Sequence, residues 1–176
     1  MKRLLGCFAI GCLAPVAALV ILGLVLPRTW TAESSVWIER PISQIHPYVE
    51  DFERWKEWVQ WERPGSTDRA TLEISGSGEV GSSIRFEGKD IGEGVLTITE
   101  TDPAAGLTYD TVLQGGTVTG NGSIRYQSLD GGTRVTWRDE GTLPRVIGGL
   151  TSWITSAGLT KKFSEDLERL KSIVEQ

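Results

Sequence analysis

Three side chains are the candidates for an acid–base catalyst in this sequence: the carboxyl of Asp139 and the phenols of Tyr109 and Tyr126. A dehydration or cyclisation needs a proton donor or acceptor at the substrate, which a buried carboxyl with a raised pKa or a positioned tyrosine supplies. All three lie where apolar and polar residues alternate, the pattern of a strand with one buried face. Asp139 stands near the end of its segment, which favours exposure to solvent. The three are candidates only, and the sequence assigns no catalytic residue.

Metal and cofactor chemistry has little support. His46 is the only histidine, and both cysteines, Cys7 and Cys12, lie in an N-terminal apolar segment, so the rest of the chain cannot build a site from several histidines or from thiolates. His46 lies at a predicted helix start, where a solvated or capping role is favoured. The stretch GSGEVG over residues 76–81 matches a dinucleotide fingerprint, but a predicted strand follows it where the fingerprint needs a helix. No metal and no cofactor is therefore expected.

The first 26 residues are suited to a membrane. Leu4 to Leu26 contains 23 residues without a charge and would span about 34 Å as a helix, enough to cross a bilayer. Lys2 and Arg3 precede it, so the positive-inside rule places the N-terminus in the cytoplasm and the domain outside. Trp30, four residues beyond the run, is expected at the level of the lipid headgroups. We therefore predict a single-pass protein of the cell membrane with an extracytoplasmic domain; the alternative is secretion after signal-peptide cleavage.

A linker over residues 27–33 and one domain over residues 34–176 make up the remainder. A length of 150 residues suits one compact domain. All 23 acidic residues but only 16 of the 18 basic ones lie there, which gives a net charge of −7. Nucleic-acid binding is typical of a basic surface, so this charge argues against nucleic acid as a partner.

The candidate residues depend on a predicted sheet for their positions. A strand is predicted over residues 34–39 and ends before Pro41. Apolar residues then recur at spacings of three and four as far as Trp61, interrupted by Pro47, which predicts two short helices or one kinked helix. The strands that follow are joined by turns too short for anything but antiparallel neighbours. They are predicted over residues 72–75, 82–88, 93–100, 107–113, 118–127 and 133–140.

A long helix is predicted at the C-terminus, because Phe163, Leu167, Leu170 and Val174 recur at helical spacing. A curved sheet cannot hide its concave face alone, so this helix is expected to lie across it.

The charge-free stretch over residues 146–159, with its three glycines, leaves two interpretations open. It is the N-terminal part of the last helix, buried against the sheet, or it is a mobile gate over a cavity. In the second case Trp153 and Ile154 would contact a ligand or a membrane.

Local strings along the domain carry a family signal. Each is weak alone, but their order and spacing are specific: Ser34-Ser35-Val36-Trp37-Ile38 before Pro41, Tyr48-Val49-x-Asp51-Phe52-x-x-Trp55-x-x-Trp58, Gly92-x-Gly94 before Leu96-Thr97-Ile98-Thr99-Glu100, Gly131-Gly132-Thr133-x-Val135-Thr136-Trp137, and Phe163-x-x-x-Leu167-x-x-Leu170-Lys171. Over residues 33–175 the chain resembles the START-like superfamily, also called SRPBCC, in its polyketide cyclase/dehydrase-type branch. The resemblance implies an α+β helix-grip fold, a curved antiparallel sheet wrapped around a long C-terminal helix with an apolar cavity. It also implies lipids, sterols, polyketides or similar ligands, and no universal catalytic set.

Large aromatic side chains are predicted to line this cavity. Alternation turns the strand aromatics to the concave face, and a buried tyrosine or tryptophan needs a hydrogen-bond partner for its polar tip. Packed core is the ordinary role of such positions, whereas polar tips that face inward favour a ligand site. The predicted cavity residues are Trp58, Phe86, Tyr109, Tyr126, Trp137 and Trp153.

The favoured function is non-catalytic binding or handling of an apolar small molecule or lipid by a membrane-anchored domain. Two alternatives stay open. One is an enzyme of the cyclase or dehydratase kind, built on the acid and the tyrosines named above. The other is a domain with a closed core that acts through protein partners.

Overall fold

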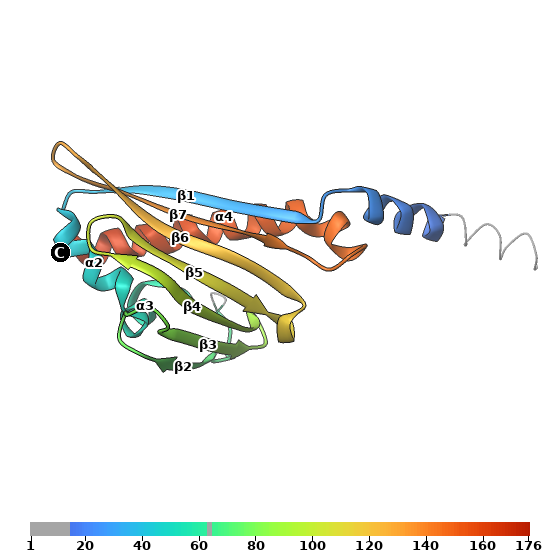
Figure 1. Ribbon diagram of the computed structural model, residues 1–176, viewed down its shortest axis with the longest axis horizontal. Helices are drawn as coiled ribbons and strands as arrows, with labels where there is room; N and C mark the ends of the chain where they lie inside the picture. Colours follow the sequence, from blue (N-terminus) through green and yellow to red (C-terminus); the bar gives the residue numbers. More distant parts are fainter. Residues whose placement is uncertain (1–14, 63–64) are drawn as a thin grey trace, which may run out of the picture.

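The computed structural model describes residues 15–62 and 65–176. A helix over residues 15–25 precedes a curved sheet and three further α-helices (Figure 1). In chain order the elements are β1 (Thr29–Ile38), α2 (Ile42–Glu50), α3 (Phe52–Trp58), β2 (Thr71–Ser75), β3 (Ser83–Gly88), β4 (Gly92–Asp102), β5 (Gly106–Leu113), the 3₁₀ turn η1 (Gln114–Gly116), β6 (Val118–Leu129), β7 (Gly132–Thr142) and α4 (Ile147–Val174).

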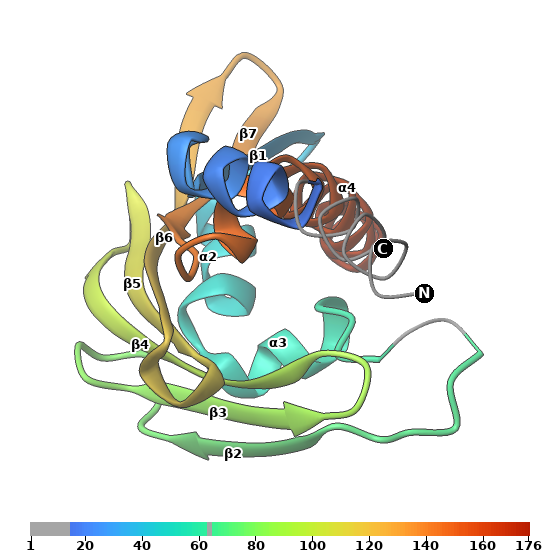
Figure 2. The same cartoon turned by 90° about the vertical axis from the view of Figure 1, so that its right-hand side faces the viewer.

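One antiparallel sheet of seven strands forms the body of the domain, in the order β1-β7-β6-β5-β4-β3-β2. The strands curve around α2, α3 and the C-terminal part of α4, which lie on the concave side (Figures 1 and 2). Consecutive strands from β2 to β7 are neighbours, as the short turns predicted, and β1 closes the sheet beside β7. The predicted α+β helix-grip fold is confirmed.

β1 begins at Thr29, five residues before the predicted strand, and so includes most of the predicted linker over residues 27–33. Its side chains alternate between exposed and buried from its first residue, and its pairing with β7 extends to Thr29↔Thr142. The expectation that Trp30 lies among lipid headgroups is therefore wrong. The Trp30 side chain is 3% exposed and belongs to the core, because β7 supplies a paired neighbour for this end of β1.

Two short helices follow β1, as predicted, but they separate at Asp51 and not at Pro47. Pro47 lies inside α2, whereas Asp51 has an extended backbone (φ −103°, ψ 116°). Its Oδ1 accepts a hydrogen bond from the Glu53 backbone N–H at 2.9 Å, the usual contact of a helix N-cap. The break lets α3 bury both Trp55 and Trp58.

The C-terminal half of α4 fills the concave side of the sheet. Its predicted apolar face is buried, namely Phe163, Leu167, Leu170 and Val174. Asp166 is buried among them and accepts hydrogen bonds from Lys162 Nζ and Arg169 Nη2, both at 2.5 Å, and from the Gln60 backbone N–H at 3.0 Å. A buried carboxylate is tolerated only with such partners. Asp166 therefore joins α4 to the chain just after α3.

The N-terminal half of α4 runs beside the edge strand β1. Ser156 Oγ accepts a hydrogen bond from the Thr31 backbone N–H at 3.2 Å, and Ser152 Oγ donates one to the Pro27 carbonyl at 3.0 Å. These contacts cover an edge that would otherwise expose unpaired backbone groups. Of the two interpretations of residues 146–159, the structure supports a helical start of α4, but this part borders β1 and leaves one side to solvent.

The described residues contain no helix long and apolar enough to cross a membrane. The predicted span over residues 4–26 extends beyond them, since residues 4–14 lie outside the described part of the chain. Residues 15–25 of that span are helical, and the large side chains from Val16 to Leu26 are exposed. Figure 1 shows this helix projecting from the domain at the end where α4 begins.

Replacing Asp166 with alanine should lower the free energy of unfolding by about 3 kcal/mol, because two cations and a backbone N–H lose their buried acceptor. Urea denaturation measures the loss. Glu165→Ala is the matched control, since Glu165 is exposed on the same helix and lies 3.8 Å from Lys161; its removal should cost less than about 0.5 kcal/mol. Equal losses in the two variants would contradict the role of Asp166.

Candidate ligand-binding site

Five aromatic rings from four elements meet in the centre of the core. The ring centroid of Trp55 in α3 lies 5.2 Å from that of Trp58, 5.9 Å from that of Tyr109 in β5 and 5.4 Å from that of Trp137 in β7. Phe163 of α4 stacks on Trp137 at 4.3 Å. These separations are those of direct ring contact. Three predicted cavity residues, Trp58, Tyr109 and Trp137, thus come together and pack against one another.

The polar atoms of this cluster bond to each other. Trp137 Nε1–H donates to the Tyr109 hydroxyl at 2.7 Å, and that hydroxyl donates to Asp139 Oδ1 at 2.5 Å. Gly122 of β6 lies between Tyr109 and Asp139 in the strand register. A Cβ on Gly122 would lie 2.0 Å from Asp139 Oδ1 and 2.4 Å from the Tyr109 hydroxyl oxygen. Because Gly122 has no side chain, the Tyr109 hydroxyl can reach across β6 to Asp139.

Asp139 is buried, with only 8% of its surface exposed, which corrects the expectation of a solvated strand end. β7 continues past it to Thr142 and is paired with β1 on one side and β6 on the other. Burial raises the pKa of Asp139 to about 7, although the hydrogen bonds from Tyr109 and Trp137 act in the opposite direction. Burial, followed by the charge of Asp139, raises the pKa of Tyr109 well above its ordinary value.

A carboxyl that exchanges its proton near neutrality is suited to acid–base chemistry. Asp139 and Tyr109, however, are both buried and direct their polar atoms at each other. The hydrogen-bond partners that the inward polar tips were expected to need are thus supplied by the protein itself. The arrangement is a packed polar network inside an aromatic core.

Tyr126 belongs to a second cluster, next to α2. Its hydroxyl lies 3.1 Å from His46 Nδ1, and His46 Nε2 lies 2.9 Å from the Glu50 carboxylate. Burial, followed by the charge of Glu50, raises the pKa of Tyr126. His46 is buried, which overturns its expected solvated or capping role. Its spacing in the sequence could have predicted this burial, because His46 lies four residues after Ile42 and three before Val49, on the buried face of α2.

The remaining two predicted residues have other neighbours. Phe86 of β3 packs against Trp61, with ring centroids 5.5 Å apart. Gly94 lies beneath the Phe86 ring, where a Cβ would come within 2.6 Å of it. Trp153, by contrast, is 69% exposed on α4.

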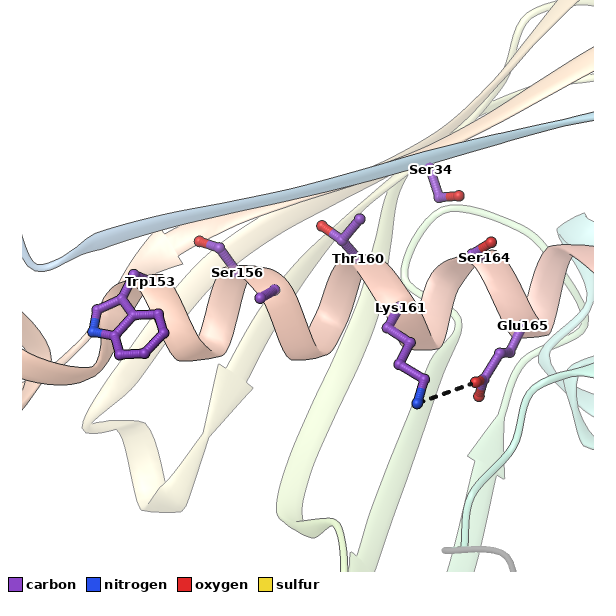
Figure 3. A pocket seen from close by; sticks show the side chains of 8 residues that line it. Ser34, Trp153, Ser156, Thr160, Lys161, Ser164 and Glu165 are labelled. Atoms are coloured by element: carbon purple, nitrogen blue, oxygen red, sulfur yellow. Dashed lines mark ion pairs between the residues drawn. The ribbon is translucent and has the colours of Figure 1, made fainter.

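Trp153 stands at one end of an open hollow between β1 and α4 (Figure 3). Small side chains of the two elements create the hollow, with Ser34 on the strand above Thr160 and Ser164 on the helix. Its volume is about 950 Å³, and its lining consists of Ser34, Trp153, Ser156, Ala157, Thr160, Lys161, Ser164 and Glu165. None of the other five predicted cavity residues lines this hollow.

An antiparallel sheet gripping a long terminal helix around an aromatic core defines a START-like domain. Residues 29–175 match the family model described as polyketide cyclase / dehydrase and lipid transport, and the chain belongs to this family. The resemblance stated from the sequence is therefore confirmed. Comparison with curated proteins gave no match.

Solved structures from several bacteria share the fold. Protein CV1439 from Chromobacterium violaceum is 14% identical, with 83% of this chain and 97% of that chain covered and a TM-score of 0.62. The protein TTHA0849 from Thermus thermophilus is 17% identical, with 82% and 96% covered and a TM-score of 0.63. The Aha1 dimer from Colwellia psychrerythraea is 19% identical, with 82% and 96% covered and a TM-score of 0.58. Identities this low show the fold alone.

Asp139→Asn should remove a pH dependence of stability. Because the pKa of about 7 in the folded state lies above that of an unfolded aspartate, folding favours the protonated form. The stabilisation is complete below the unfolded pKa and is lost as the pH rises through 7, with a loss on the order of 3 kcal/mol between pH 5 and pH 8. Urea midpoints at the two pH values should differ in the wild type more than in Asp139→Asn. Asp110→Asn, which changes an exposed carboxyl on β5, should behave like the wild type; a wild-type slope in Asp139→Asn would refute the assignment.

Proposed function

We propose that this protein binds an apolar molecule, with lipid as the natural class, and does so without catalysis. The observation that carries the proposal is the hollow between β1 and α4, with the exposed Trp153 at its end. The Trp153 indole offers a large apolar face while its N–H donates to the Leu150 carbonyl at 3.1 Å. Ile154, also exposed, extends the apolar surface beside it.

The aromatic interior is the second proposed binding site for such a ligand. Trp58, Phe86, Tyr109, Tyr126 and Trp137 lie on the concave side of the sheet, and the Trp58, Tyr109 and Trp137 rings already pack in one cluster. A ligand there would have to part these rings, whereas the hollow at Trp153 is open. We therefore expect the ligand to contact Trp153 first and the interior residues only if α4 moves away from the sheet.

We also propose that Leu4–Leu26 anchors the protein in the cell membrane and that the domain lies on the extracytoplasmic side. The support is the charge-free composition of this segment and the basic residues Lys2 and Arg3 before it. The apolar side chains exposed along the helix over residues 15–25 are further support, since water is a poor environment for them. A lipid ligand would be available next to such an anchor.

Trp153→Ala should weaken the binding of a fluorescent fatty acid to the full-length protein in detergent by about tenfold, because the ligand loses the contact area of the indole. A fluorescence titration measures the dissociation constant. Val80→Ala is the control, since Val80 is also an exposed apolar side chain and lies in the turn before β3. Unchanged affinity in Trp153→Ala would move the site to the interior, and no binding by the wild type would favour the protein-partner alternative.

Fractionation and protease protection test the anchor and its orientation. The chain should stay with the membrane pellet in alkaline carbonate, since a spanning apolar helix is not extracted by high pH. Protease added to intact cells should cleave the domain. Recovery in the carbonate supernatant would refute the anchor, and cleavage only after lysis would refute the orientation.

A further inference from the structure

Most of the large apolar side chains that are exposed lie at one end of the described structure; the exceptions are Val80, Val112 and Leu129. On the first eight residues of α4, Ile147 is 66%, Trp153 is 69% and Ile154 is 53% exposed. Ile147 and Ile154 are seven residues apart and so lie on one side of the helix. The neighbouring helix over residues 15–25 and the residue that follows it add Val16, Leu19, Val20, Ile21, Leu22, Leu24, Val25 and Leu26.

A close backbone contact holds these two helices together. Gly23 is buried where it passes the start of α4: a Cβ on Gly149 would lie 2.2 Å from the Gly23 carbonyl oxygen, and a Cβ on Gly23 would lie 2.4 Å from the Val146 carbonyl oxygen. Two side chains could not fit in this contact, so glycine is required at both positions. The end of the apolar helix therefore has a defined place beside the first turn of α4.

Basic residues border this apolar end. Arg28 and Arg145 line a hollow of about 350 Å³ between the apolar helix and the start of α4, and both are exposed. Arg28 Nη1 donates to the Leu143 carbonyl at 3.4 Å, and within the described chain neither guanidinium is paired with a carboxylate. Residues 141–164 contain three basic residues and no acidic one, although the protein as a whole is acidic. An anionic partner fits this surface.

We propose that the N-terminal half of α4 docks on the surface of a phospholipid bilayer. Ile147, Trp153 and Ile154 enter the interface, and Arg28 and Arg145 bind lipid phosphates. The proposal rests on the proposed membrane anchor: once Leu4–Leu26 spans the bilayer, the Gly23–Gly149 contact brings the first turns of α4 to the headgroups. Tryptophan and arginine are the side chains that interfaces of this kind favour.

A bilayer fits these observations better than a protein partner does. The exposed apolar side chains of α4 lie next to the helix over residues 15–25, whose residues are all apolar, and the two charged residues that line the hollow between these helices, Arg28 and Arg145, are both basic. Farther along α4 the exposed side becomes charged, beginning at Lys161 and continuing with Glu165 and Glu168. The exposed apolar side chains of α4 are thus confined to the part of the helix nearest the proposed anchor. This distribution is the one expected of a helix that touches a membrane at one end.

A probe at Ile154 tests the docking in the full-length chain. With Cys7 and Cys12 replaced by alanine, Ile154→Cys carries an environment-sensitive fluorophore, and the protein is reconstituted into phosphatidylcholine vesicles with or without phosphatidylglycerol. Acyl-brominated lipid should quench the Ile154 probe and leave a control probe on Val80→Cys unchanged, because Val80 lies in the turn before β3. Equal, water-like emission from both probes in protein that stays with the vesicles in carbonate would overturn the docking and leave the anchor intact.

A second experiment tests the role of Arg28 and Arg145. Anionic lipid should raise the ratio of docked to undocked probe by about fivefold for each arginine, and Arg28→Gln with Arg145→Gln should abolish this rise. Arg134→Gln, a change of an exposed arginine on β7, should retain it. Shielding of the Ile154 probe that depends on protein concentration and not on lipid would show a second copy on this face and refute the proposal. Extraction of the protein by carbonate would refute the anchor and the docking together.

Discussion

The stacking of Phe163 on Trp137 joins the long helix to the concave face of the sheet. A curved antiparallel sheet leaves its concave face open to water unless another element covers it, and this contact, 4.3 Å between ring centroids, sets the C-terminal half of α4 against β7. α4 is one continuous helix of 28 residues. Once its C-terminal half is held in the core, its N-terminal half has to continue along β1 toward the end of the domain. The exposed position of Trp153 is the consequence.

The two carboxylates inside the domain show how the same core admits polar groups. Asp166 has two cations and a backbone N–H around it, and it joins α4 to the chain after α3. Asp139 receives hydrogen bonds from neutral donors, foremost the Tyr109 hydroxyl, so burial dominates and its pKa rises to about 7. The first arrangement fixes the position of the helix. The second supplies hydrogen-bond partners for the polar atoms of Tyr109 and Trp137 inside the aromatic cluster.

The two halves of α4 therefore have different surroundings. Its C-terminal half packs against rings that are already in contact with each other, and its N-terminal half presents the hollow at Trp153 and the apolar side chains beside it. The glycine contact between Gly23 and Gly149 ties this open part to the apolar N-terminal helix.

The sequence alone determined the elements whose signals are local. Alternation and short turns predicted the antiparallel strands, and the spacing of Phe163, Leu167 and Leu170 predicted the helix that they grip. It also placed Tyr109 and Trp137 of the aromatic cluster on one face of the sheet, because strand parity decides which side chains share a face.

The tertiary structure decided what depends on neighbours distant in sequence. Trp30 is buried and Asp139 is not at a strand end because β1 pairs with β7 along its whole length, as far as Thr29↔Thr142. The Tyr109–Asp139 hydrogen bond depends on Gly122 in a strand between them. The alternation within one strand does not show which strand will pair with it in the sheet. Strand pairing also decides which tryptophan is buried. Trp30 is buried because β1 pairs with β7, and Trp153 is the tryptophan that stays exposed beside the apolar helix.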